Sequence, residues 1–296
     1  MTRAYLALAA ICIIWGTTYT AIKFAVSDFP PFLLVGIRQS MAGMLLLSLA
    51  AAKGKTFRSD RKYLLRQMFT GFFTITGGNG FVTWGMQFVS SGLAAIIGSL
   101  TPVAVVLINI AWRGAEMINA RVIAGVLLGF GGLGLVFHDG WLDFLRVEYR
   151  WGIVACFASC FSWSLGTVMA KRWNNTAASP LYNAGLQLTA GGLGSIVLHF
   201  LFNPSAQIHH TTAGWLAIFY LVTIGSALAF TLYTYVLSHL SATVSSLYTY
   251  INPVVAIFLG WIFLGEHLTF WTVLGMAITI VGVWLVNSGQ RRRLRA

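Results

Sequence analysis

The chain has 296 residues, of which 57% are hydrophobic and only 9% are charged. A soluble domain carries roughly 25% charged residues, because polar side chains must cover its core, so this composition excludes a soluble globular protein. The formal net charge of +12 would favour nucleic-acid binding in a soluble protein. In a membrane protein it reports topology instead, because cytoplasmic loops collect Lys and Arg. We therefore expect a protein of the lipid bilayer with no nucleic-acid partner.

Apolar runs of about 20 residues follow one another along the chain, separated by short charged or proline-marked breaks. A helix of that length spans the roughly 30 Å hydrocarbon core of a bilayer. The sequence therefore predicts an all-α, polytopic membrane protein with ten transmembrane helices. The expected helices are Ala4–Val26, Pro31–Ala52, Leu64–Phe88, Leu93–Trp112, Val122–Phe137, Trp151–Lys171, Pro180–Phe202, Ala213–Val236, Ala242–Leu264 and Phe270–Asn287. The connections are too short to hold a soluble catalytic domain.

The basic residues predict how these helices are oriented. With the N-terminus in the cytoplasm, fifteen of the nineteen Lys and Arg residues lie in cytoplasmic segments, including the basic tail 289–296. Arg146 and Arg150 fall in an outer loop beside acidic residues, whereas Lys23 and Arg38 fall in the outer halves of the first two helices. The positive-inside rule therefore places both termini in the cytoplasm.

Two halves of the chain, 1–138 and 150–288, echo each other at nearly constant spacing. Matched positions include Trp15 and Trp163, Lys23 and Lys171, Pro31 and Pro180, Gly36 and Gly185, Arg38 and Gln187, Gly43 and Gly192, Pro102 and Pro253, Glu116 and Glu266, Gly125 and Gly275, and Gly132 and Gly282. Each half holds five expected helices, an odd number, so the second half must be inverted in the membrane. Inverted repeats are typical of alternating access around a central cavity. The alternative is a duplication with a purely structural outcome.

Five parts of the sequence also carry a family resemblance: Ile14–Thr18, Arg38, Leu100–Val103, Ile251–Val254 and Gly265–Leu268. Together they resemble the drug/metabolite transporter superfamily, within it the ten-helix branch with two EamA domains, whose bacterial members export metabolites and amino acids. The resemblance implies a cavity lined by helices 1 to 4 and 6 to 9, with helices 5 and 10 as peripheral scaffold. Four-helix multidrug members couple transport to protons through a glutamate in their first helix, and the first helix here has no acidic residue.

Pro102 and Pro253 lie at matched depths inside apolar segments. A proline removes one backbone hydrogen bond, so Pro102 should free the carbonyl of Gly98, and Pro253 that of Thr249. An unpaired carbonyl in hydrocarbon costs several kcal/mol unless protein or cavity water satisfies it. We interpret the two prolines as hinges or cavity walls, and a simple packing kink is the alternative.

Arg38 is a charged residue well inside an apolar segment, and such residues usually face a cavity or a partner. Its guanidinium fork suits a carboxylate or phosphate, which favours an amino acid or organic anion as substrate. The alternative is snorkelling, because Arg38 is only about 10 Å from the outer end of its helix at helical rise. Snorkelling is the favoured interpretation for Lys23.

Uncharged polar and aromatic residues complete the predicted cavity. Asn79 lies among three glycines, which allow a substrate or another backbone to approach closely. A cavity with aromatic faces binds apolar, ring-bearing or cationic metabolites, although Trp84 and Tyr235 lie near helix ends, where aromatic belts are usual. The predicted substrate-binding residues are Trp15, Thr18, Arg38, Asn79, Trp84, Trp163, Gln187, Tyr235, Tyr248 and Asn252.

The chain shows no pattern typical of a cofactor, a metal or ATP. Cys12, Cys156 and Cys160 lie inside apolar runs and are interpreted as small buried residues. The histidines have no metal spacing, and the sequence has neither a His-Glu-x-x-His motif nor a phosphate-cradling Gly-Lys-Ser/Thr loop. We therefore expect no metal, no cofactor and no enzymatic activity.

The leading functional hypothesis is a secondary transporter of the inner membrane that exports a small metabolite, such as an amino acid or related zwitterion. Export of drugs or other organic solutes on the same fold is the alternative. An intramembrane enzyme would need facing acid, base or nucleophilic groups at membrane depth, and a non-transporting receptor would need large loops. The sequence leaves open the substrate, the coupling ion, the direction of transport and whether the protein is a monomer or a homodimer.

Overall fold

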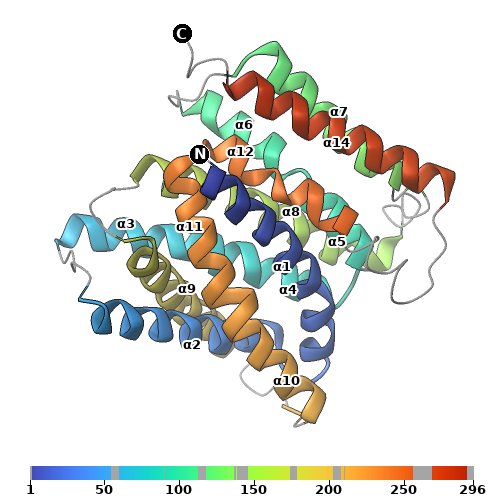
Figure 1. The fold of residues 1–296 in the computed structure, drawn as a ribbon. Helices are drawn as coiled ribbons and strands as arrows, with labels where there is room; N and C mark the ends of the chain where they lie inside the picture. Colours follow the sequence, from blue (N-terminus) through green and yellow to red (C-terminus); the bar gives the residue numbers. More distant parts are fainter. Residues whose placement is uncertain are drawn as a thin grey trace.

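The structure of the chain is a computed structural model that describes residues 2–54, 60–89, 91–112, 118–136, 138, 146–173, 179–202, 208–209, 211–255 and 269–291. Every regular element in these ranges is helical (Figure 1). Six described stretches of 19 to 28 residues are long and apolar enough to cross a membrane: Pro31–Ala52, Leu93–Ala111, Val147–Trp173, Pro180–Phe202, Thr212–His239 and Phe270–Gly289. Their length and composition fit a multi-pass membrane protein.

The first half of the chain contains two long helices followed by shorter helical pieces. Helices α1 (Thr2–Val26) and α2 (Pro31–Ala52) run without interruption. The third predicted segment is divided into α3 (Arg61–Gly71), the π-helix η1 (Phe72–Asn79) and α4 (Gly80–Gly85). The fourth is divided into α5 (Ser91–Gly98) and α6 (Thr101–Ala111), and α7 (Ala120–Val136) ends this half.

The second half follows a similar order. A short 3₁₀ turn, η3 (Val147–Tyr149), leads into α8 (Arg150–Trp173), which is followed by α9 (Pro180–Phe202). The next segment is again divided by a π-helix, with α10 (Thr212–Tyr220), η4 (Leu221–Leu228) and α11 (Ala229–His239). Helix α12 (Ala242–Ser246) and a helical stretch over 248–255 precede α14 (Phe270–Arg291). The rest of the predicted segment Ala242–Leu264 and the matched pair Glu116 and Glu266 lie outside the described residues.

The helices that carry the π segments begin with side-chain caps. The carboxylate of Asp60 accepts a hydrogen bond of 3.0 Å from the backbone N–H of Tyr63 at the start of α3. The hydroxyl of Thr211 accepts one of 3.0 Å from the N–H of Gly214 at the start of α10. These bonds satisfy N–H groups that the first helical turn leaves unpaired. Both helices are therefore anchored before the backbone changes to π geometry.

Two pairs of helices are packed through glycines. Helix α2 lies beside α9, and α7 lies beside α14 at the edge of the bundle (Figure 1). A Cβ added at Gly132 of α7 would lie 2.7 Å from the carbonyl oxygen of Gly275 in α14, and one added at Gly275 would meet the carbonyl oxygen of Gly132. Small residues let helix backbones approach closely where lipid surrounds them. The glycines matched in the two halves thus form the helix contacts.

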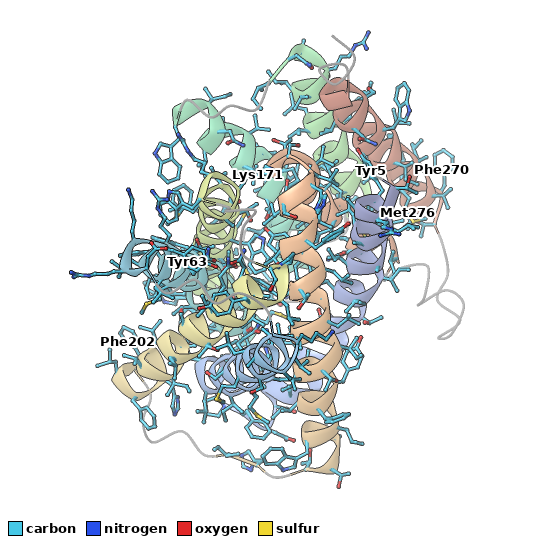
Figure 2. All side chains as sticks on the ribbon, turned by 60° about the vertical axis from the view of Figure 1, so that its left-hand side comes forward. Tyr5, Tyr63, Lys171, Phe202, Phe270 and Met276 are labelled. Atoms are coloured by element: carbon cyan, nitrogen blue, oxygen red, sulfur yellow. The ribbon has the colours of Figure 1, made fainter. Side chains whose placement is uncertain are left out.

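The outer surface of the bundle carries large apolar side chains. Phe202 at the end of α9 is 76% exposed and Phe270 at the start of α14 is 72% exposed, and both point away from the bundle (Figure 2). Water would oppose such exposure, whereas lipid tails accept it. The surface therefore fits a lipid environment.

Inside the bundle, Tyr5 of α1 reaches α14, where its hydroxyl donates to the side-chain oxygen of Asn287 over 2.7 Å.

Candidate functional site

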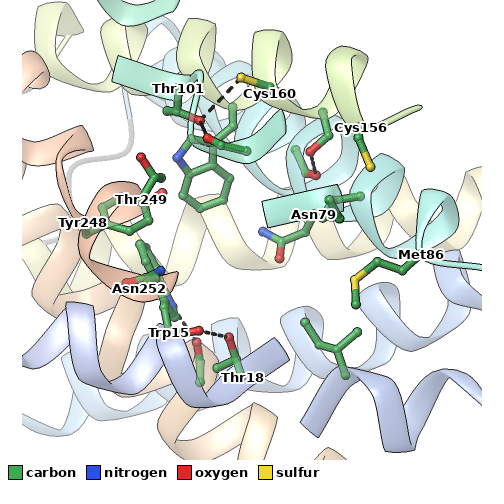
Figure 3. A pocket seen from close by; sticks show the side chains of 18 of the residues that line it. Trp15, Thr18, Asn79, Met86, Thr101, Cys156, Cys160, Tyr248, Thr249 and Asn252 are labelled. Carbon is green, nitrogen blue, oxygen red and sulfur yellow. Dashed lines mark hydrogen bonds between the residues drawn. The ribbon is translucent and has the colours of Figure 1, made fainter. Parts of the chain in front are cut away.

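A cavity of about 120 Å³ lies between the two halves of the chain (Figure 3). Its walls come from α1, α2, η1, α4, α5, α6, α8, η4, α11 and the helical stretch 248–255. The lining includes Trp15, Thr18, Ile22, Arg38, Gln39, Gly78, Asn79, Val82, Met86, Ala94, Gly98, Thr101, Cys156, Ser159, Cys160, Trp163, Gly225, Ser226, Phe230, Tyr248, Thr249 and Asn252. The cavity therefore combines one cationic side chain with amides, hydroxyls, thiols and aromatic rings.

Arg38 extends from α2 into this cavity and is only 3% exposed. Its Nη2 donates to the side-chain oxygen of Asn79 over 2.8 Å, and its Nη1 donates to the hydroxyl of Ser226 over 3.2 Å. Its Nε has no hydrogen-bond partner among the described residues. Both partners are neutral, so within the described part of the chain the charge of the guanidinium is stabilised by dipoles and not by a carboxylate. The burial argues against snorkelling to the membrane surface.

Both partners of Arg38 belong to π-helical segments. Asn79 is the last residue of η1, and Ser226 lies within η4. A π turn is wider than an α turn and is frequent at functional sites. Side chains of neighbouring helices satisfy carbonyls in these segments: Ser159 donates to Gly78 over 2.5 Å, and the indole N–H of Trp15 donates to Gly225 over 3.1 Å. Neighbouring helices thus hold both π segments in place beside the cavity.

Aromatic rings form one wall of the cavity. The ring centroids of Trp15 and Tyr248 are 4.6 Å apart, and those of Trp15 and Trp163 are 5.6 Å apart, both in edge-on geometry. Phe230 of α11, which also lines the cavity, packs edge-on against Trp163 with a centroid distance of 6.4 Å. Aromatic pairs prefer such edge-to-face contacts, which stabilise a cluster beyond simple burial. The wall is therefore a rigid apolar surface beside a polar one.

Asn252 links two helices at the edge of the aromatic wall. With its amide oriented to match its neighbours, its nitrogen donates to the backbone carbonyls of Cys12 over 3.0 Å and Tyr248 over 2.9 Å. The first bond joins α1 to the helical stretch 248–255 next to Trp15. Thr18, one turn along α1, donates its hydroxyl to the carbonyl of Trp15 over 2.8 Å and also lines the cavity.

The two prolines sit in different backbone settings. Helix α5 ends at Gly98, and Pro102 is in the first turn of α6 after a break at Ser99 and Leu100. The predicted free carbonyl of Gly98 accepts a hydrogen bond of 2.7 Å from the hydroxyl of Thr101. Pro253 lies within the continuous helical stretch 248–255. Both prolines are buried, and Thr101 and Thr249, their neighbours, line the cavity.

The cavity brings together Trp15, Thr18, Arg38, Asn79, Trp163, Tyr248 and Asn252, but three other predicted residues lie elsewhere. Gln187 is buried against α3, where its side-chain nitrogen donates to the side-chain oxygen of Gln67 over 2.6 Å. Trp84 packs edge-on against Phe88 at the end of α4, with a centroid distance of 4.9 Å. Tyr235 packs on His239 near the end of α11, with a centroid distance of 4.2 Å. Local partners therefore hold these three side chains outside the lining.

Several lining residues were not predicted. Gln39 follows Arg38 in the sequence, and its buried side-chain oxygen has no hydrogen-bond partner in the described ranges. Cys156 and Cys160, expected to be buried, are free thiols four residues apart on the wall formed by α8. Adjacency to Arg38 could have indicated Gln39, whereas nothing in the sequence indicates which face of α8 meets the cavity. Among the described residues, no group of three His, Cys, Asp or Glu could hold a metal ion.

Comparison with known proteins identifies a family for this chain. The EamA-like transporter family matches it over residues 2–138 and again over residues 150–288. The "Uncharacterized inner membrane transporter YedA" of Escherichia coli K12 is 29% identical over 289 residues, covering 96% of this chain and 90% of that protein. The "Uncharacterized transporter YvbV" of Bacillus subtilis 168 is 27% identical, covering 100% and 95%.

The fold also matches a solved structure. A crystal structure entitled "Crystal structure of protein" covers 97% of this chain and 98% of its own, with a TM-score of 0.77 and 21% sequence identity. The family match extends over both halves of the chain, and the cavity lies between these halves. The chain belongs to the EamA-like transporter family and is a multi-pass membrane transporter of the drug/metabolite type, which works on a small-molecule substrate in a lipid environment.

Proposed function

We propose that the protein is a secondary transporter that exports a small metabolite, such as an amino acid or related zwitterion, across the inner membrane by alternating access. The observation that carries this proposal is the cavity between the two halves, which joins a buried guanidinium to amides and an aromatic wall. A guanidinium fork suits a carboxylate, and the rings suit the apolar part of a metabolite. The direction of transport is taken from the family resemblance.

The same proposal includes ten transmembrane helices in two inverted repeats, 1–138 and 150–288, and a basic tail over 289–296. The glycine contacts between α2 and α9 support it. A Cβ on Gly36 would meet the carbonyl of Gly192, and a Cβ on Gly43 would meet that of Gly185. Because Gly36 matches Gly185 and Gly43 matches Gly192, exchanging the halves maps one contact onto the other. A pseudo-twofold relation between the repeats accounts for this reciprocity.

Breaks in the helices around the cavity support movement between two states. The two π-helices, η1 and η4, and the break between α5 and α6 all border the cavity. Helix geometry changes most easily where the regular hydrogen-bond ladder is already interrupted. In this proposal Pro102 is a hinge that keeps the α5–α6 break open, and Pro253 is the hinge of the other half inside the continuous helical stretch 248–255.

No described carboxylate lines the cavity. This favours a facilitator or an exchanger driven by solute gradients over proton coupling through a buried Asp or Glu. The described acids that contact other groups lie at the ends of helices, as Asp60 does at the start of α3 and Asp28 does beside Thr211. Transport should therefore persist when the proton gradient is collapsed.

Counterflow in liposomes tests the proposed function. Purified protein is reconstituted with an internal pool of unlabelled amino acid, and uptake of the labelled amino acid is followed with and without a proton uncoupler. We expect transient accumulation above equilibrium in both conditions. The same assay with amines and other organic solutes tests export of drugs or organic solutes. Folded protein that moves none of these solutes would contradict the proposal.

Labelling of single cysteines in a cysteine-free background tests the proposed orientation. Cysteines introduced at Arg3 and Arg295 should react with a membrane-impermeant maleimide only after the inner membrane is opened. A cysteine at Arg146 should react in intact spheroplasts. Labelling of Arg3 and Arg295 on different sides would rule out both cytoplasmic termini and the odd-numbered inverted repeats.

A further inference from the structure

The charge inside the cavity is unbalanced. Arg38 is 3% exposed, and the residues to which it donates hydrogen bonds, Asn79 and Ser226, carry no charge. No described carboxylate lies within ion-pair distance of the guanidinium, and none lines the cavity. A buried charge without an opposite charge is strongly unfavourable, whereas a paired one is tolerated. The cavity therefore favours an occupant that brings a negative charge.

The polar atoms around Arg38 leave a place for that negative charge. The Nε–H of Arg38 is buried and has no hydrogen-bond partner among the residues that the structure describes, and the Arg38 side chain lines the cavity. Guanidinium N–H groups form a planar fork that binds the two oxygens of a carboxylate side by side. Asn79 and Ser226, on the two π segments, hold the other two nitrogens and fix the plane of the fork. Arg38 is thus positioned to bind a carboxylate and would repel an ammonium group.

The aromatic wall requires that the ligand also carry an apolar group. Trp15, Trp163 and Tyr248 present rings locked by edge contacts and, for Trp15, by the hydrogen bond to Gly225. Such a wall takes a planar apolar group. A single water needs roughly 10–15 Å³ of cavity space, so about 120 Å³ has room for about ten non-hydrogen atoms. This size accommodates one ring with a short acidic side chain and excludes a nucleotide.

We propose that the cavity is a binding site for small aryl carboxylates, with the carboxylate on Arg38 and the ring against Trp15, Trp163 and Tyr248. The inference rests on the proposed transport cavity and narrows its substrate class. Negative charge is required and an amino group is not, because no carboxylate in the described lining faces it. Organic cations, a common class of exported drugs, are therefore excluded.

Equilibrium binding to the purified protein in nanodiscs tests this class with matched probes. Radiolabelled phenylacetate is competed with unlabelled phenylacetate, 2-phenylacetamide, phenethylamine and acetate. These share the ring and differ in charge, or share the charge and lack the ring. We expect phenylacetate to compete at least tenfold better than each of the other three. Equal competition by phenethylamine or 2-phenylacetamide would overturn the requirement for a negative charge, and equal competition by acetate would overturn the role of the aromatic wall.

Variants of Arg38 test the residue itself. R38Q should weaken phenylacetate binding at least tenfold, and R38K should bind it more weakly than wild type but keep its preference over phenethylamine. R66Q, which removes a cation on α3 outside the cavity lining, should bind like wild type. Unchanged binding in R38Q would overturn the proposal. If R38Q fails to fold, R38K and the wild-type competition decide it: loss of the preference in R38K counts against the site.

Counterflow of labelled phenylacetate separates this inference from the transport proposal. Binding that depends on Arg38 without movement across liposomes would reject transport of this class and leave the binding site standing. Amino-acid counterflow that phenethylamine inhibits as well as phenylacetate does would support transport and reject the anionic preference.

Discussion

Two matched positions in the halves of the molecule have different surroundings. Arg38 on α2 and Gln187 on α9 are buried to a similar degree, at 3% and 4% exposure. Arg38 faces the cavity and donates to Asn79 and Ser226, whereas Gln187 is sealed against Gln67, 2.6 Å away. The glycines around them make reciprocal contacts in both halves. Packing is therefore shared by the halves, but of the two matched positions Arg38 lines the cavity and Gln187 does not.

The glycine packing that the two halves share should be the most sensitive to substitution. In α7, a Cβ on Gly132 would lie 2.6 Å from the backbone nitrogen of Thr279, whereas a Cβ on the neighbouring Gly131 would meet nothing within 4 Å. Gly132→Leu should destabilise the protein by about 3 kcal/mol or more, because the backbone of α14 cannot move aside. Gly131→Leu should behave like wild type. Fluorescence-detected size exclusion and thermal unfolding measure both, and equal stability of the two variants would contradict glycine packing at this contact.

The cavity position should affect transport more than stability. Arg38→Gln should lower transport about 100-fold, equivalent to about 2.7 kcal/mol, since the carboxylate loses its cationic partner. Its melting temperature should stay the same or rise, because an unbalanced buried charge is removed. Counterflow and thermal unfolding measure the two effects, with Arg66→Gln as the charge-matched control. Wild-type transport by Arg38→Gln would remove the functional distinction between the matched positions.

Gln187 should show the reverse pattern. Gln187→Leu leaves the side-chain oxygen of Gln67 buried without its donor, which should cost about 1–3 kcal/mol of stability. The double variant Gln67→Leu/Gln187→Leu removes both polar groups and should recover most of that loss. Transport per folded molecule should stay close to wild type in both. A large loss of transport in the stable double variant would show that Gln187 has a role in the substrate path.

The smallest expected effect is at the link between α1 and the second π segment. Trp15→Phe keeps a ring in the aromatic wall but removes the hydrogen bond to the carbonyl of Gly225, at a cost of about 1 kcal/mol. Thermal unfolding should detect a small decrease, and the same change at Trp284, which is 64% exposed on α14, should have no effect. Equal melting temperatures for both variants would mean that this hydrogen bond does not stabilise the fold.

The long helices could be predicted closely from hydropathy, but their interruptions could not. The predicted Pro31–Ala52 and Pro180–Phe202 coincide with α2 and α9, because an apolar run that starts at a proline defines both its length and its beginning. The predicted segment Leu64–Phe88 instead contains η1. Hydropathy measures whether residues prefer lipid, and it does not depend on whether the backbone hydrogen bonds follow an α or a π pattern.

The candidate site shows a similar limit. Arg38 was identifiable because a charge in an apolar segment needs a special environment. Gln187 was chosen because it matches Arg38, but a repeat position does not specify the partner, and Gln67 on α3 occupies its amide. Ser226 carries no sequence signal, although it binds Arg38. Contacts between distant segments depend on how whole helices pack, and they cannot be predicted from one sequence alone.

The π segments have one more consequence, for the spacing of residues along their helices. Each π turn accommodates a residue more than an α turn, and one residue corresponds to a rotation of about 100° in an α-helix. In η1 the additional residue in the π turn determines which way the side chains after Asn79 point, including Val82 and Met86, which line the cavity. Deleting a single residue from 72–79 would turn these side chains away from the cavity while leaving the helix intact. The number of residues in this stretch is thus as much a part of the site as the side chains themselves.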